Sequence, residues 1–431
     1  MGMGIIGTPD ERRPSIANDP EKLNSVKIYA FALEQYEKFL QGVKSHIPSL
    51  SKEQGRRMAM IACLLVVCTE TMMFQFGNSL SHAQSGLALF EDLLNDGLDV
   101  NDRDGLYSPK PNIIEDELVQ QYYRMELQTM AVYDTRAPSA HWRLGKEGTG
   151  SIRDMPKEFT SVEQARLHLD LVMRRTYHFM TYALADRATF LKFRDVGTQR
   201  NIPSSSTPDL APEGIKPRLM EASDELQVEQ EIHCSENRRW SQAFEPLYRS
   251  ALRNIDQAES IRVLLLKIHS LTTKIRLAGH ISKTEMVYDD FMPDFEKIVN
   301  LGKTVLNHPH ADKFFAEGSF SLDLGLIYCL MTPATTCRDR HLRREAIALL
   351  SIRSWREAQW GSETSADVAK WIVEVEEDGV ETESIPEWAR ARLRVIDASL
   401  EKKTAHLYCI RGVGESLTHK DTIRYWGDMG G

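Results

Sequence analysis

The sequence predicts an all-α protein, a multi-helix array, and three observations lead to this fold class. Apolar residues recur at spacings of three and four over most of the 431 residues, which is the period of an amphipathic helix. Stretches rich in Gly and Pro interrupt that pattern where connections between helices are expected. The alternating pattern of a strand is weak and is seen at 404–410.

The N-terminal half begins with two long predicted helices. Residues 22–47 form a helix whose apolar stripe is spaced by three and four: Tyr29, Leu33, Tyr36, Leu40 and Val43. A second helix covers about 52–74. Its centre, Met58–Cys68, is apolar on all sides, which predicts a buried helix.

Three further helices, a loop and an irregular excursion complete this half. A helix follows Gly77 and ends at Gly97, since glycine favours a helix C-terminus. After a loop at 99–112, residues 113–133 are again helical. Residues 134–158 are rich in Gly and Pro and predict an irregular excursion. The capping box Ser161–Gln164 then begins a helix that runs to about residue 194.

Residues 195–217 are the clearest linker, because they combine four prolines with a run of serines. We therefore divide the chain into a disordered or truncated start (1–20), an N-terminal helical half (21–194), this linker, and a C-terminal helical half (218–431). Predicted helices of the last part lie near 219–232, 236–253, 256–278, 289–306, 320–332, 339–352 and 364–377.

Composition and charge exclude several classes of protein. The chain is 42% hydrophobic and 27% charged, an ordinary globular balance, and its net charge is −9. An acidic chain binds nucleic acid poorly without a basic patch, so we expect no direct nucleic-acid contact. Six scattered cysteines without a CxxC pair indicate reduced thiols in an intracellular protein. The longest apolar run, 58–68, is too short to span a bilayer, and no membrane contact is expected.

The motifs in the sequence that resemble cofactor or metal sites do not predict a bound cofactor or metal. Gly2–Gly7 matches GxGxxG, but no strand can precede it, so we expect no nucleotide cofactor. His308 and His310 flank a proline and cannot share a helical face, so we expect no metal there.

Two charged runs are assigned structural roles. The segment 338–344 carries four arginines, which we expect to tie helices together through carboxylate pairs rather than to contact phosphates. Residues 374–383 carry six carboxylates and predict a solvated helix end and loop.

Aromatic residues gather within the predicted helices: Tyr122, Tyr123, Tyr133, Trp142, Tyr177, Phe179 and Tyr182. They indicate core packing, or alternatively an aromatic-lined cavity for an apolar small-molecule ligand or substrate.

Several short stretches, taken in order, carry a family resemblance: Tyr36–Lys38, Ala59–Glu70, Ala83–Leu87, Tyr123–Gln128, Cys337–Ala346, Arg356–Ser362 and Ala369–Trp371. Over about residues 26 to 412 they resemble the helical regulatory region of fungal binuclear zinc-cluster transcription factors. The resemblance implies an all-α domain behind a six-cysteine zinc cluster that reads DNA.

The chain departs from that family pattern in a decisive way. No cysteine precedes Cys63, so the zinc cluster is absent from this sequence and DNA binding is not inherited. Smaller departures lie at Arg340, Ala358 and Gly361, where the family tends to have proline, glycine and aspartate. The family offers no catalytic residues to carry over.

Two main functions follow, with a pure scaffold as a third. The first is a transcription-regulator-like domain in the nucleus that senses a metabolite or dimerises, either with itself or with an intact zinc-cluster factor. The alternative is a cytoplasmic, cofactor-independent cyclase or isomerase of fungal natural-product biosynthesis, since a scaffold can be recruited for chemistry.

If the protein is an enzyme, the catalytic candidates are polar residues within the aromatic helices: Glu70, His82, Arg124, Glu126 and His178. Glu70 follows the apolar run, where burial raises a carboxyl pKa and suits it to acid–base work. Arg124 and Glu126 project on different sides of one helix. The alternative for all five is structural pairing.

Overall fold

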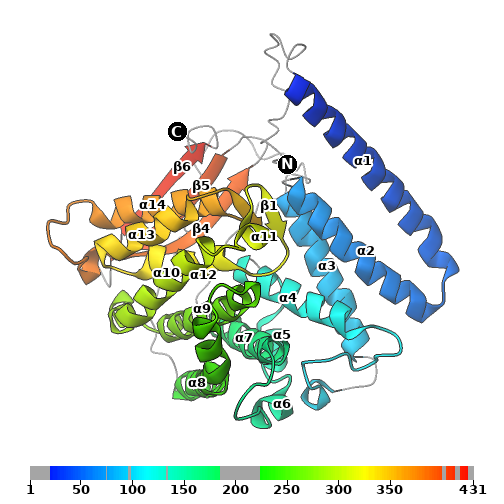
Figure 1. Cartoon of the computed structure of the whole chain (residues 1–431), viewed down its shortest axis with the longest axis horizontal. Coiled ribbons are helices and arrows are strands. Elements are labelled where there is room, and N and C mark those ends of the chain that lie inside the picture. The colour runs from blue at the N-terminus through cyan, green and yellow to red at the C-terminus, as the bar shows by residue number, and fades with distance from the viewer. Residues whose placement is uncertain are drawn as a thin grey trace, which may run out of the picture.

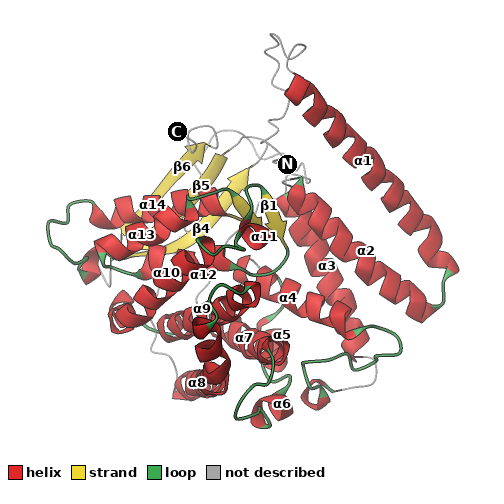
Figure 2. Ribbon diagram, viewed as in Figure 1, coloured by secondary structure: helices red, strands yellow, loops and turns green. Residues whose placement is uncertain are grey.

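The computed structural model describes residues 20–73, 75–95, 99–132, 134–184, 224–399, 404–412 and 418–425. Within these ranges the chain is mostly helical, as predicted, and it also contains two small β-sheets (Figure 2). The predicted start lies outside the described residues except for Pro20, and the predicted linker lies outside them altogether.

A helical hairpin forms one side of the molecule (Figure 1). Helix α1 (Pro20–His46) leads through the short 3-10 helix η2 (Ile47–Ser49) into α2 (Lys52–Met72), which Ser51 and Gln54 begin with a capping box. The prediction that α2 is buried on all sides is wrong, because Leu65 is 49% exposed. The apolar stripe of α1 is also largely uncovered.

Helices α3 (Phe76–Asn95) and α4 (Asp116–Val132) pack behind this hairpin, with η3 (Val100–Asp102) between them. The predicted irregular excursion contains two short helices, α5 (Pro138–Leu144) and α6 (Thr149–Arg153). Proline at the first position of α5 and a left-handed glycine before α6 explain why a Gly/Pro-rich stretch is helical here. The predicted capping interaction of Ser161 and Gln164 opens α7 (Val162–Leu184).

The C-terminal part adds two long antiparallel helices and a group of shorter ones. Helix α8 (Asp224–Arg253) is continuous where two helices were predicted, because no glycine or proline divides residues 224–245. The others are α9 (Ala258–His280), η5 (Glu285–Phe291), α10 (Met292–Leu306), α11 (Asp312–Phe315), α12 (Leu326–Thr336), α13 (Arg340–Leu350), α14 (Ser362–Glu377) and η6 (Glu387–Ala389).

Both sheets have three strands. In the first, β2 (Trp355–Glu357) pairs in parallel with β1 (Ser319–Ser321) and antiparallel with β3 (Trp360–Gly361). The first turns of the helix predicted at 320–332 are thus a strand and a turn. In the second, β4 (Ala391–Ser399), β5 (Thr404–Arg411) and β6 (Thr418–Tyr425) form an antiparallel meander. The strand expected at 404–410 is confirmed as β5.

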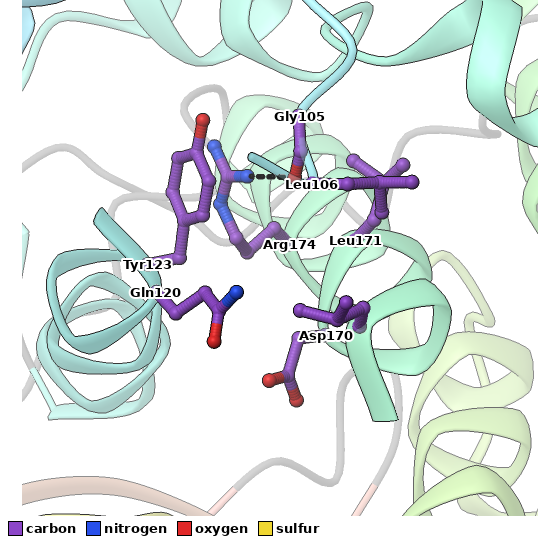
Figure 3. Close-up of a pocket in the computed structure, with 8 residues that line it drawn as sticks. Gly105, Leu106, Gln120, Tyr123, Asp170, Leu171 and Arg174 are labelled. Atoms are coloured by element: carbon purple, nitrogen blue, oxygen red, sulfur yellow. Dashed lines mark hydrogen bonds between the residues drawn. The ribbon is translucent and has the colours of Figure 1, made fainter. Parts of the chain in front are cut away.

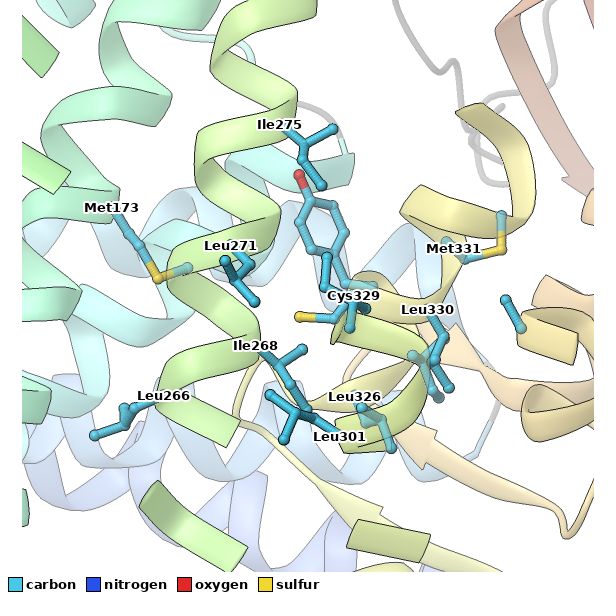
Figure 4. Packing of buried hydrophobic residues seen from close by; sticks show 14 of the residues in the cluster. Met173, Leu266, Ile268, Leu271, Ile275, Leu301, Leu326, Cys329, Leu330 and Met331 are labelled. Carbon is cyan, nitrogen blue, oxygen red and sulfur yellow. The ribbon is translucent and has the colours of Figure 1, made fainter. Parts of the chain in front are cut away.

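The hydrophobic core has two main parts. The larger one joins α7 with α8, α9, α10, α12, α13 and α14, so it draws on residues from both sides of the predicted linker. Figure 4 shows a part of it, with labelled residues from α7, α9, α10 and α12. The smaller one lies between α2, α3 and α4. The candidate site residues lie between and beside these two cores.

Candidate functional site

The structure places the five candidate residues in three separate clusters. Glu70 and His82 lie together on α2 and α3. Arg124 and Glu126 leave opposite sides of α4, as predicted, and join different partners. His178, on α7, lies beside Glu126.

The Glu70 and His82 side chains form a carboxylate–imidazole dyad. Glu70 is buried, and its Oε2 lies 2.7 Å from Nδ1 of His82. Tyr36 of α1 donates its hydroxyl hydrogen to the other oxygen at 3.1 Å. The His82 side chain is 49% exposed. A buried carboxylate therefore orients an imidazole that solvent can reach.

Arg124 belongs to an ion-pair group that spans three elements. It lies 3.3 Å from Asp170 of α7 and 3.9 Å from Asp323, which follows β1. Arg166 binds Asp323 as well, at 2.7 Å. With two cations facing two carboxylates, this group balances its own charge and ties α4 and α7 to the segment before α12.

Glu126 lies in a buried charge cluster. Its oxygens accept hydrogen bonds from Arg136 at 2.5 Å and from Arg174 at 2.8 Å. Burial opposes ionisation of this carboxyl, but the nearby Arg136 and Arg174 guanidinium groups outweigh it and hold the pKa of Glu126 well below its usual range. Arg174 also binds Glu147 at 2.5 Å. Glu126 is thus a permanently ionised partner of arginine and a poor proton donor.

Two histidines extend this cluster. Nδ1 of His178 lies 2.9 Å from Nδ1 of His141, so one ring donates a hydrogen to the other. The outer nitrogens face carboxylates: His178 Nε2 lies 3.3 Å from Glu126, and His141 Nε2 lies 3.7 Å from Asp134. Burial lowers both ring pKa values, that of His141 to about 4, so both rings are neutral at pH 7.

Sequence reasoning missed Asp134, Arg136, His141 and Glu147, all from the segment predicted to be irregular. It also passed over Arg174 and Arg175, although a signal was present. Two adjacent arginines stand in the otherwise apolar centre of α7, and such residues are buried only when they are paired. Arg175 binds Glu236 of α8 at 2.7 Å.

A small pocket lies beside this cluster (Figure 3). Gly105, Tyr123, Asp170 and Arg174 are among its lining residues. The Arg174 guanidinium stacks on the Tyr123 ring, 3.5 Å from its centre. The remaining volume is about 10 Å³, enough for about one water molecule.

The arginines at 338–344 pair with carboxylates, as predicted. Arg338 and Arg343 bind Glu376 at 3.2 and 2.7 Å, and the neighbouring Glu377 takes the other two arginines. The prediction of a solvated acidic run is therefore wrong at Glu376, which is fully buried. Glu376 lies on α14. Its second carboxylate oxygen accepts a hydrogen bond from the Ala391 N–H at the start of β4.

Of the aromatic residues that suggested a cavity, Tyr122, Tyr123, Tyr177 and Phe179 are buried in the cores, Trp142 is exposed, and Tyr133 lies outside the described residues. Within the described ranges, no three His, Cys, Asp or Glu side chains are placed to hold a metal ion. The helices described there include none long and apolar enough to cross a membrane. No protein-family model, curated protein or solved structure matches the chain.

Proposed function

We propose that the chain is a regulatory domain of the zinc-cluster-factor type that acts as a homodimer in the nucleus. The observation that carries this proposal is the uncovered apolar face of α1. Tyr29, Leu33 and Leu40 of this stripe are each about two fifths exposed on a 27-residue helix. Exposed apolar stripes of this length are typical of interaction surfaces.

The occupant we propose for this face is a second copy of the chain. A stable interface buries about 800 Å² on each partner. Helix α1 is about 40 Å long, and the outer face of α2 adds the exposed Leu65 and Met72. The hairpin thus offers an area of the required order. A two-fold axis brings the same stripe of both copies together, so a single exposed face suffices.

The charge clusters support binding over catalysis. Arg124, Glu126 and His178 are held in balanced groups of ion pairs and hydrogen bonds. The five candidates do not converge on one cavity. A reaction needs a group left free to exchange a proton with substrate, whereas these three side chains are all engaged with charged partners.

Molar mass in solution tests the dimer. Size-exclusion chromatography of the full chain, coupled to light scattering, should give twice the chain mass. Leu33→Glu with Leu40→Glu places charge on the stripe and should give the monomer. The matched control, Gln35→Glu with Ser45→Glu, adds the same charge at exposed positions on the other side of α1 and should remain dimeric. A monomeric wild type overturns the homodimer.

One observation favours the enzyme alternative, a cofactor-independent cyclase or isomerase. Of the three candidate clusters, only the Glu70–His82 dyad contains a histidine whose side chain is exposed to solvent. A carboxylate that orients an accessible imidazole is the usual arrangement of a general base.

A gene-deletion strain separates the two functions. We expect transcripts to change on deletion and to recover when the strain is complemented with His82→Gln, since a regulator does not need the imidazole. If transcripts hold steady while one metabolite accumulates, and His82→Gln fails to clear it, the enzyme alternative replaces our proposal.

A further inference from the structure

One lysine of α9 is buried against the neighbouring helices. The Lys267 side chain is 9% exposed, whereas lysines of surface ion pairs, such as Lys38, Lys303 and Lys370, are more than half exposed. An ammonium group that loses water on burial needs hydrogen-bond acceptors in exchange. The groups around Lys267 therefore decide which state of this amine the fold stabilises.

The carboxylates beside Lys267 are already engaged by other cations. The oxygen of Glu245 lies 4.0 Å from Nζ of Lys267, too far for a hydrogen bond, and Glu245 accepts a hydrogen bond from Arg249 at 2.9 Å. Asp294 binds Lys274 at 2.6 Å. Within the described residues, no hydrogen bond reaches Nζ of Lys267.

A second ammonium group lies by the same aromatic ring. Nζ of Lys267 is 5.4 Å from the centre of the Tyr248 ring, and Nζ of Lys297 is 5.0 Å from it. In the part of the chain that the structure describes, no carboxylate forms an ion pair with Lys297. The three residues come from α8, α9 and α10, and α9 lies between the other two helices (Figure 1). Positive charge is thus in excess here.

These surroundings favour the neutral amine. Burial and the nearby Lys297 ammonium lower the pKa of Lys267, and the Glu245 and Asp294 carboxylates offset only part of that effect. The Lys274 ammonium acts in the same direction as Lys297. A lysine amine is a nucleophile only when it is neutral, and desolvation or a neighbouring cation is a known way to activate it.

The nitrogen of Lys267 is open to small molecules. It makes no hydrogen bond within the described residues, yet it is not one of the fully buried polar atoms there that lack a partner. The exposed part of the side chain therefore includes the nitrogen, as expected for a lysine that buries its stem. A small reagent can reach this amine from solvent and needs no deep cavity.

We propose that Lys267 is a nucleophilic amine that captures a small carbonyl compound carrying a carboxylate. The amine nitrogen bonds to the carbonyl carbon, and the carbonyl oxygen leaves as water with the two hydrogens of the amine. An imine results, and no oxidant or reductant is consumed. Lys297, which has no carboxylate partner in the described ranges, pairs with the carboxylate of the bound compound.

Reductive trapping of the imine tests the site. The full chain is incubated at neutral pH with glyoxylate, which joins an aldehyde to a carboxylate, and cyanoborohydride converts the imine to a stable amine. Mass spectrometry of peptides gives the labelling at Lys267 and at the exposed Lys370. We expect Lys267 to be labelled several-fold more than Lys370. Equal or lower labelling of Lys267 overturns the proposal.

Acetaldehyde, which lacks the carboxylate, measures the contribution of charge. The ratio of labelling at Lys267 to that at Lys370 corrects for the different reactivity of the two aldehydes. This ratio should be larger with glyoxylate, because Lys297 attracts its carboxylate. A ratio as large with acetaldehyde would refute the assignment of an anionic carbonyl compound.

Lys297→Met separates an activated amine from an ordinary one. The variant removes the like charge beside Lys267 and keeps an unbranched side chain against Tyr248. We expect labelling of Lys267 by both aldehydes to fall towards that of Lys370. The matched control, Lys303→Met, removes an exposed lysine of the same helix and should leave the labelling of Lys267 as in the wild type. An unchanged ratio in Lys297→Met contradicts the activation.

This site goes beyond the proposed function and does not depend on the homodimer. It lies on α8, α9 and α10, whereas the α1–α2 hairpin forms another side of the molecule (Figure 1). The Leu33→Glu, Leu40→Glu variant should therefore be labelled at Lys267 as the wild type is. A dimeric chain without preferential labelling refutes this site alone, and a monomeric wild type with it refutes the homodimer alone.

Discussion

Arg343 shows how single buried residues hold this molecule together. Its guanidinium is fully buried and lies 2.7 Å from a carboxylate oxygen of Glu376, which is also fully buried. Arg338 binds the same carboxylate at 3.2 Å. One acidic residue of α14 thus binds two arginines from the segment that opens α13, and Glu285 supplies a second negative charge to Arg338 at 3.1 Å. Loss of Arg343 removes the shorter of the two ion pairs that Glu376 makes in the core.

Arg343→Met should destabilise the protein by about 3–5 kcal/mol, because it breaks a buried pair and leaves α13 without its link to Glu376. The free energy of unfolding in urea measures the loss. Arg344→Met is the matched control. It removes a half-exposed arginine of the same helix, one that binds Glu377 next to Glu376. Its cost should stay below about 1 kcal/mol, and equal costs would contradict the argument.

The His141–His178 pair predicts a dependence of stability on pH. Burial lowers the pKa of His141 to about 4, whereas an unfolded histidine binds a proton near pH 6.5. The unfolded chain therefore holds more protons between these values, and the free energy of unfolding falls as pH drops from about 6.5 towards 4. This ring should contribute about 3 kcal/mol to that fall.

Urea unfolding at pH 7, 5.5 and 4.5 tests the contribution. His141→Gln should reduce the fall without abolishing it, because burial also lowers the pKa of His269. His46→Gln, at the exposed end of α1, should keep the pH dependence of the wild type. A variant His141→Gln as pH-sensitive as the wild type would refute this role.

From the sequence, some of these residues could be chosen as candidates, but their partners could not be identified. Glu126 and His178 were both chosen as candidates, yet nothing in the chain between them shows that they meet. The partners Asp134 and His141 stand in a segment whose glycines and prolines hid two short helices. Long-range pairing depends on how α4, α5 and α7 pack, and local periodicity does not contain that information.

At the scale of the element, α2 and α3 approach closely because of one glycine. A Cβ at Gly86 of α3 would lie 2.4 Å from Sγ of Cys63 on α2. Gly86→Ala should therefore cost about 1–3 kcal/mol through overpacking. Adding Cys63→Ala removes the sulfur and should recover most of that loss. The free energies of unfolding of both single variants and the double variant measure the coupling.

Gly42 provides the comparison for this substitution. It lies within α1, and a Cβ there would meet nothing within 4 Å. Gly42→Ala should stabilise the protein by about 0.5–1 kcal/mol, since alanine favours a helix. If both glycine variants have the same effect, helix propensity rather than the α2–α3 contact governs Gly86.

Long helices were predictable because their apolar stripes repeat over many turns, as in α9 and α10. The sheets were not. Strands β1, β2 and β3 have two or three residues each, too few to show a period. Strand β4 mixes charged and apolar residues, including Arg392, Arg394 and Asp397, and its partners follow only later in the chain.

At the scale of the whole molecule, the proposed dimer predicts a concentration-dependent Tm. A dimer forms only between folded chains, so raising the protein concentration should raise Tm. The Leu33→Glu, Leu40→Glu variant should show no such dependence. Scanning calorimetry over a hundredfold range of concentration measures both, and a constant Tm for the wild type would contradict self-association.

The larger core has one more consequence. It joins α7 to α8 and α9, although α7 ends at Leu184 and α8 begins at Asp224. We therefore expect a protein cleaved between these two residues to retain the same core as a non-covalent complex. Its two pieces, expressed separately, should find each other and reassemble, which makes this chain a natural scaffold for a split reporter.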